Sequence, residues 1–119
     1  MFSPEVLDHF KNPRNVGPLE NATASVEVSN PVCGDVLQLA ARVESGKIVE
    51  AKFLCRGCTT AIACASCLTE LLTGSSVDAL REICAEAIAA ALGGLPSETI
   101  HGAQLTADAA RALLAQLRR

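Results

Sequence analysis

An apolar run gives way to a helical pattern within the segment Phe53-Leu-Cys-Arg-Gly-Cys-Thr-Thr-Ala-Ile-Ala-Cys-Ala-Ser-Cys-Leu-Thr-Glu-Leu-Leu72. The residues from Ile48 to Leu54 predict a strand, and the pattern becomes helical after Arg56-Gly57. Four of the six cysteines fall in this segment, so thiols collect at a strand-to-helix junction. The first turn of a helix presents unpaired N–H groups and the positive end of the helix dipole, which favour thiolate over thiol. The junction is therefore a candidate site for metal binding or thiol chemistry.

Two further strands are predicted on the N-terminal side of this junction. Alternating apolar and polar residues predict one strand over 24–29 and another over 36–43. The sequence Glu44-Ser-Gly-Lys47 is typical of a tight turn between the second and third strands. These features predict three antiparallel strands.

Helices are predicted at the start of the chain and after the junction. Ser3 is a suitable N-cap for a first helix that ends at Asn12-Pro13 and has an apolar stripe of Val6, Leu7 and Phe10. The later segments are predicted as helices over 59–72, 77–83 and 84–92, a loop over 95–102, and a last helix that opens at 106–108. Strands first and helices second predict an α+β fold, with helices packed on a three-stranded antiparallel sheet, as one domain over residues 1–119.

Composition excludes several classes of function. The formal net charge of −3 provides no basic surface, which argues against a nucleic-acid partner. The apolar runs are too short to span a membrane. Met1-Phe-Ser-Pro-Glu5 leads into a charged amphipathic segment without the features of a secretory signal, which predicts a cytoplasmic protein. In that compartment six cysteines indicate reduced thiols, metal ligands or redox groups more than structural disulfides.

A second group of candidate ligands is Cys33-Gly34-Asp35. It places a soft thiolate two residues from a hard carboxylate, and the intervening glycine allows both to face one point. An ordinary alternative is an aspartate in a turn beside a small buried cysteine. Antiparallel pairing would bring Cys33 to the same end of the sheet as Cys58, which favours the interpretation as a ligand group.

The other thiols and the two histidines are less informative. Only five residues separate the pairs Cys55/Cys58 and Cys64/Cys67, which is too few for a structural zinc site built from two knuckles. Cys67 and Cys84 are expected to pack in the core, and the roles of Cys55 and Cys64 stay open between packing and ligation. His101, in the predicted loop, is a further donor suited to iron or zinc. His9 is expected on the first helix near its solvated side, in a structural role.

Several motifs carry a resemblance to a known family. They are Asp8-His-Phe-Lys-Asn-Pro-Arg-Asn-Val-Gly17, Asn30-Pro-Val-Cys-Gly-Asp35, Gly57-Cys58, Ala61-Ile-Ala63, Thr69-Glu70, Leu95-Pro96 and Ile100-His101. In this order they resemble the IscU / NifU N-terminal family, whose members are scaffolds for iron–sulfur cluster assembly. The resemblance covers nearly the whole chain. It implies a three-stranded antiparallel sheet with packed helices and a carrier that is not an enzyme.

The resemblance also implies a site for iron and a labile [2Fe–2S] cluster that is passed to acceptor proteins. By position, the implied ligands of the metal are Cys33, Asp35, Cys58 and His101. The family's third cysteine directly follows the histidine, and here that position is Gly102. Either the four implied residues bind the cluster, or Cys55 or Cys64 replaces the missing thiol. Because that third cysteine is implicated in receiving sulfur from a cysteine desulfurase, its loss argues against ordinary sulfur acceptance.

Partners and alternatives follow from the same comparison. The family's chaperone motif Leu-Pro-Pro-Val-Lys is here Leu95-Pro-Ser-Glu-Thr99, which argues against recognition by the specialised Hsp70 and J-protein chaperones. One alternative function is a thiol redox or zinc-dependent sulfur-relay protein built on Cys55-Arg-Gly-Cys58. Another is a degenerate family member that binds zinc. The sequence leaves open whether one chain or a homodimer holds a cluster.

Overall fold

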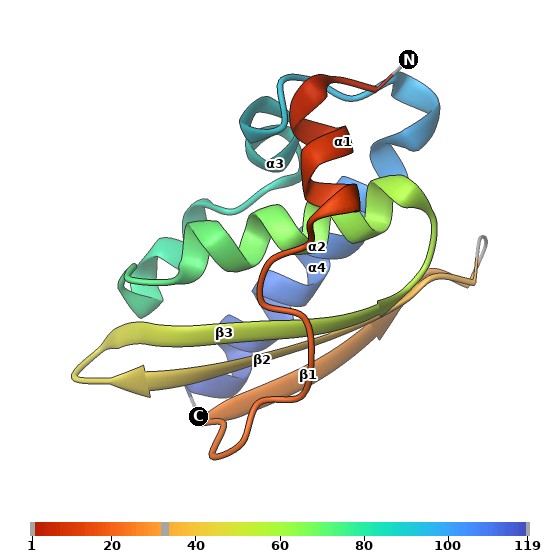
Figure 1. Cartoon of the computed structure of the whole chain (residues 1–119). Coiled ribbons are helices and arrows are strands. Elements are labelled where there is room, and N and C mark those ends of the chain that lie inside the picture. The colour runs from red at the N-terminus through yellow and green to blue at the C-terminus, as the bar shows by residue number, and fades with distance from the viewer. Residues whose placement is uncertain (1, 32–33, 119) are drawn as a thin grey trace.

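Three antiparallel strands form one sheet in the computed structural model, which describes residues 2–31 and 34–118 (Figure 1). The strands are β1 (Ala24–Ser29), β2 (Val36–Glu44) and β3 (Lys47–Arg56), in the spatial order β1-β2-β3. Ser45 and Gly46 have φ angles of 53° and 77°, as a tight hairpin turn between β2 and β3 requires. The predicted sheet, its turn and its antiparallel pairing are confirmed.

Helices cover one face of this sheet (Figure 1). In chain order they are α1 (Pro4–Lys11), α2 (Thr59–Leu72), the 3₁₀ helix η1 (Val77–Glu82), α3 (Ala85–Ala91), the 3₁₀ helix η2 (Ser97–Thr99) and α4 (Ile100–Leu117). α2 and α4 pack on the sheet, while α1 packs on α2 and α3 packs on α4. The predicted α+β architecture is confirmed. Within the part of the chain that the structure describes, none of the helices has the length and apolar character needed to cross a membrane.

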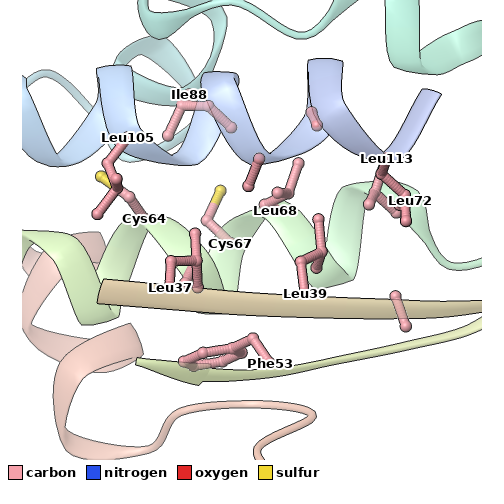
Figure 2. Packing of buried hydrophobic residues seen from close by; sticks show 14 of the residues in the cluster. Leu37, Leu39, Phe53, Cys64, Cys67, Leu68, Leu72, Ile88, Leu105 and Leu113 are labelled. Carbon is pink, nitrogen blue, oxygen red and sulfur yellow. The ribbon is translucent and has the colours of Figure 1, made fainter. Parts of the chain in front are cut away.

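The core lies between the sheet and the two central helices. Figure 2 shows Leu37 and Leu39 of β2 directed toward α2 and α4, where Leu68 and Leu105 are buried. Burial alternates along β2, so one face of the strand supplies the core and the other is more exposed. Cys67, at 4% exposure, packs in this core as predicted.

The outer edge of β3 is covered in two places. Loop residues 15–17 pair with Phe53 through two backbone hydrogen bonds of 2.9 Å. Residues 74–75 pair with Ile48 through hydrogen bonds of 2.7 and 2.8 Å. These contacts satisfy backbone groups that an open edge would leave free for another chain. They also hold the segments that follow α1 and α2 against the sheet.

The last helix begins earlier than predicted. α4 starts at Ile100 and not at Thr106, so the predicted loop over 95–102 was wrong at its C-terminal end. Gly102 suggested a loop because glycine is about 0.5–1 kcal/mol less favourable than alanine inside a helix. Here the first turns of α4 bury apolar side chains such as Leu105 in the core, and tertiary packing of this kind supplies most helix stability in proteins.

α1 has the predicted ends but a different buried face. Ser3 caps it by accepting a hydrogen bond from the Val6 N–H at 3.1 Å. Leu7 and Phe10 are each 39% exposed, whereas His9 is buried. The expected position of His9 near the solvated side was therefore wrong, whereas the expected structural role agrees with its contacts to polar groups on α2.

His9 joins α1 to α2 through both ring nitrogens. Its Nδ1 lies 2.8 Å from the buried Ser66 Oγ, and its Nε2 lies 3.3 Å from Glu70 Oε1. Ser66 Oγ also accepts a hydrogen bond of 2.9 Å from the Arg14 N–H. Burial and the charge of Arg14 lower the pKa of His9 below 6.5, against the opposing attraction of Glu70 and Asp8. The folded state therefore favours the neutral ring.

This lowered pKa predicts a loss of stability in mild acid. Below pH 6.5 the unfolded chain binds a proton at residue 9 more readily than the folded chain, so the free energy of unfolding should fall as the pH drops. One proton limits the slope to about 1.4 kcal/mol per pH unit. Urea unfolding of the wild type and of His9→Asn between pH 7.5 and 5 would measure it, with the wild type showing the steeper decline. Equal slopes for the two proteins would contradict the prediction.

Candidate metal centre

Three side chains of different chemistry meet at one end of the sheet. Cys58 Sγ lies 3.7 Å from Asp35 Oδ2 and 3.6 Å from His101 Nε2, and the Asp35 Oδ2 to His101 Nε2 distance is 4.0 Å. Their ligand atoms all lie within 4.8 Å of one another. Among the side chains that the structure describes, this is the one group of at least three His, Cys, Asp or Glu residues that could hold a metal ion. The structure thus brings together three of the residues that the sequence predicted.

Each donor sits at an end of a regular element. Asp35 immediately precedes β2, Cys58 is the N-cap of α2, and His101 is in the first turn of α4. Element ends leave side chains less crowded than element interiors, while the packed elements behind them hold the backbone in place. The site is therefore built on the rigid core and not on a long loop.

A turn directs Asp35 to this end of the sheet. The Asn30 N–H donates to the Asp35 carbonyl at 2.9 Å, and the Gly34 N–H donates to the Asn30 carbonyl at 2.7 Å. Gly34 has a φ of 76°, a conformation that glycine adopts without the strain of a Cβ atom. The predicted bend between residues 33 and 35 is confirmed at the glycine.

Gly57 lets the Asp35 carboxylate lie against the backbone that precedes α2. Val36 pairs with Arg56, so Asp35 comes to lie beside Gly57. A Cβ atom at position 57 would be 2.9 Å from Asp35 Cγ and 3.1 Å from Ala61 Cβ, both closer than real side chains approach comfortably. In the sequence, Gly57 marks the change from strand to helix and belongs to the Gly57-Cys58 motif, but its contact with Asp35 produces no local pattern.

The group is buried on one side and open on the other. Asp35 is buried, His101 is half-buried, and Cys58 is exposed. A tetrahedral zinc ion holds its sulfur, nitrogen and oxygen ligands about 3.3–3.7 Å apart, as calculated from usual bond lengths. The three distances here, 3.6, 3.7 and 4.0 Å, are close to one face of such a tetrahedron. The arrangement can accept a metal from the solvent side with little movement.

Comparison with known proteins decides the family. The family model described as "NifU-like N terminal domain" matches residues 1–119. This chain belongs to the NifU-like N-terminal domain family. The predicted resemblance is thereby confirmed.

Relatives of this NifU-like chain include named scaffold proteins. The "Iron-sulfur cluster assembly scaffold protein IscU 1" of Archaeoglobus fulgidus is 44% identical over 111 residues, which cover 93% of this chain and 72% of the relative. The "Iron-sulfur cluster assembly scaffold protein IscU" of Haemophilus influenzae is 41% identical over 118 residues, covering 96% of this chain and 93% of the relative. The crystal structure of a nitrogen-fixing NifU-like protein (N-terminal) from Brucella abortus superposes with a TM-score of 0.78 at 18% identity and covers 98% of this chain and 93% of its own, which shows the shared fold.

The remaining thiols of this NifU-like domain lie outside the group of three. Cys64 is fully buried in the core, and burial raises its pKa to about 12. Cys55 is half-buried, and burial together with the charges of Asp35 and Cys58 raises its pKa to about 11. Neither thiol belongs to the group of three that could hold a metal ion, and in the absence of a metal burial favours the protonated thiol at both positions. For Cys64 the structure favours the packing role.

Two other cysteine predictions have different outcomes. Cys33, the first implied ligand, lies outside the described residues. Cys84 was expected to pack in the core, but it is exposed as the N-cap of α3. That prediction was wrong because α3 is short and begins at the surface, where the first residue of the helix does not reach the core.

Proposed function

We propose that this NifU-like chain is an iron–sulfur cluster assembly scaffold. It holds iron and a labile [2Fe–2S] cluster as cargo, passes the cluster to acceptor proteins and catalyses no reaction of its own. The observation that carries the proposal is the solvent-open group of Asp35, Cys58 and His101. Relatives named as scaffolds, at 44% and 41% identity, support the same function.

The proposed ligand set has four donors. Three are the described atoms of Asp35, Cys58 and His101, and the fourth is Cys33, which stands two residues before Asp35 in the sequence. Iron–sulfur clusters are usually held by four thiolates, and histidine replaces some of them in known cases. A set with two thiolates, one imidazole and one carboxylate keeps soft ligands for the cluster and adds a hard one.

This mixed set suits a carrier better than a permanent site. A carboxylate is a weaker partner than a thiolate for a cluster of iron and sulfide, so one of the four attachments is easily lost. Exposure of Cys58 leaves the cargo within reach of an acceptor's thiols. The burial of Asp35 keeps that carboxylate in place when the cluster leaves.

The proposed partners follow from this function. A cysteine desulfurase would supply sulfur and iron–sulfur proteins would accept the cluster, in the cytoplasm. Recognition by specialised Hsp70 and J-protein chaperones is not proposed, because Leu95–Thr99 lacks the lysine of the family motif. Zinc in the isolated protein and a homodimer that shares a cluster are further outcomes that the experiment below can detect.

A thiol redox enzyme on Cys55 and Cys58 is the alternative from another class. Such enzymes depend on a thiol with a lowered pKa. The pKa of Cys55 is raised, to about 11, by burial and neighbouring negative charge. These surroundings count against Cys55 as the reactive thiol of such an enzyme.

Anaerobic reconstitution tests the proposal. The purified chain is incubated with ferrous iron and sulfide, and its absorbance and Mössbauer spectra are recorded while iron and acid-labile sulfide are counted per chain. We expect a [2Fe–2S] spectrum with equal iron and sulfide, and gel filtration of the loaded protein shows whether one or two chains hold it. A chain that forms no cluster and retains zinc instead would contradict the scaffold and favour a zinc-binding protein.

Asp35→Ala is expected to lengthen the lifetime of the bound cluster. The substitution removes the hard, weakly attached ligand and leaves its place to an exogenous thiolate supplied in the assay buffer, which is a softer ligand for iron, so release to an apo-ferredoxin acceptor should slow on the order of 3–10-fold. The measurement is the decay of cluster absorbance with and without the acceptor. Asp35→Asn is the matched control, because it retains the packing against Gly57 and removes only the charge. An unchanged or shorter lifetime in both variants would contradict this role of Asp35.

A further inference from the structure

Gly102, in the first turn of α4, lies directly against the first turn of α2. It is buried, and a Cβ atom built on it would lie 3.0 Å from the Ala61 backbone nitrogen and 3.2 Å from Ala61 Cα. The same Cβ would lie 3.0 Å from Thr60 Cγ2. Two of these three neighbours are backbone atoms inside a helix, which cannot rotate away as a side chain can. A Cβ atom at position 102 is therefore tighter than most real contacts allow, and the backbone of α2 would have to give by a few tenths of an ångström to accommodate it.

The two helix starts that meet here carry two of the three metal donors. Cys58 is the N-cap of α2, and His101 directly precedes Gly102 in α4. The Thr106 hydroxyl donates to the Gly102 carbonyl at 2.9 Å, so the backbone at this position is also held from within α4. The 3.6 Å distance between Cys58 Sγ and His101 Nε2 depends on how closely the helices approach.

We propose that Gly102 is a positioning residue of the metal centre: the absence of its side chain sets the distance between Cys58 and His101. This inference rests on the proposed function and adds a residue that touches no ligand atom itself. It also means that the absence of the family's third cysteine at this position is more than the loss of one ligand. A thiol at position 102 does not restore a ligand in this chain, because its Cβ separates the two helix starts and moves His101 away from Cys58.

The test compares metal binding by three variants with that of the wild type. The probes are cobalt(II) and cadmium(II) alone. Thiolate-to-cobalt charge-transfer absorbance reports bound thiolate, and the ¹¹³Cd chemical shift reports the number of sulfur ligands. Gly102→Ala adds only a Cβ, and Gly102→Cys adds a Cβ and a thiol. Gln104→Cys, on the exposed side of the same helix, is the control for an extra thiol.

Gly102→Ala and Gly102→Cys are both expected to bind cobalt about 10–100-fold more weakly than the wild type, the range found when groups that orient ligands are changed. The cadmium shift of Gly102→Cys should show no additional sulfur ligand. Gln104→Cys should match the wild type. Thr60→Ser removes the methyl group that the new Cβ meets, so the Thr60→Ser/Gly102→Ala double variant should recover part of the affinity.

Other results overturn the inference in distinguishable ways. Wild-type affinity in Gly102→Ala, or tighter binding with one more sulfur ligand in Gly102→Cys, removes the positioning role and leaves the scaffold function intact. Failure of Gly102→Ala to fold, alone and with Thr60→Ser, makes the glycine a requirement of the fold and also overturns the role. Wild-type cobalt binding that is unaffected by Cys58→Ser and His101→Ala would instead overturn the proposed site itself.

Discussion

Cys58→Ser is expected to reduce the iron and sulfide bound after reconstitution by at least about tenfold, because the loss of a direct ligand costs no less than the loss of the groups that orient ligands. Cys58 is the one thiol among the three described donors, and it lies within 3.7 Å of both others. A serine hydroxyl is nearly the same size but is a poor ligand for a soft iron–sulfur cluster. Absorbance and the iron and sulfide content per chain measure the effect.

Cys84→Ser is the matched control for this experiment. Cys84, like Cys58, is exposed and is the N-cap of a helix, but it lies at the start of α3 and outside the group of three. Its replacement should leave the cluster content unchanged. Equal losses in the two variants would show that cluster formation depends on the number of exposed thiols and not on this site.

Leu68→Ala is expected to lower the free energy of unfolding by about 2–5 kcal/mol, the usual cost of removing a large buried side chain. Leu68 is on α2, fully buried between the sheet and α4 (Figure 2). The few aromatic residues, 3% of the chain, leave the core to aliphatic side chains, so a cavity here has few large neighbours to fill it. Urea unfolding monitored by circular dichroism measures the change.

Leu71→Ala is the control that distinguishes the cost of losing a buried side chain from the effect of a Leu-to-Ala change on the helix itself. Leu71 lies on the same helix but is 41% exposed, so the same chemical change should cost well under 1 kcal/mol, as most surface substitutions do. Equal destabilisation by the two variants would contradict the packing of α2 on the sheet. The pair therefore tests the two-layer arrangement on which the metal centre is built.

The strands and most helices could be predicted because their signals are local. The strand Ala24–Ser29 and the helix Thr59–Leu72 have the predicted bounds, since alternation, capping residues and turn residues act within a few positions. The hairpin turn at Ser45-Gly46 was also predicted from local sequence and is present in the structure. That residues 1–119 form a single domain stays a prediction.

Errors occurred where a distant contact outweighs a local preference. His9 was expected near the solvated side of the first helix, but it is buried, and Ser66 and Glu70 on α2 contact the two nitrogens of its ring. Gly102 was expected in a loop, but it is helical and packs against Ala61. In both cases the partner is far away in the sequence, so the residue's own surroundings in the chain contained no signal.

For the candidate site too, some features could be predicted from the sequence and others required the tertiary structure. The sequence alone predicted Asp35, Cys58 and His101 as donors, because residue chemistry and the family motifs are properties of the chain itself. Their meeting within 4.8 Å required the tertiary structure, since it depends on the approach of β2, α2 and α4. That approach leaves little space for a Cβ atom at Gly57 and Gly102. The sequence could not reveal this, because the neighbouring atoms belong to residues that only the tertiary structure brings close.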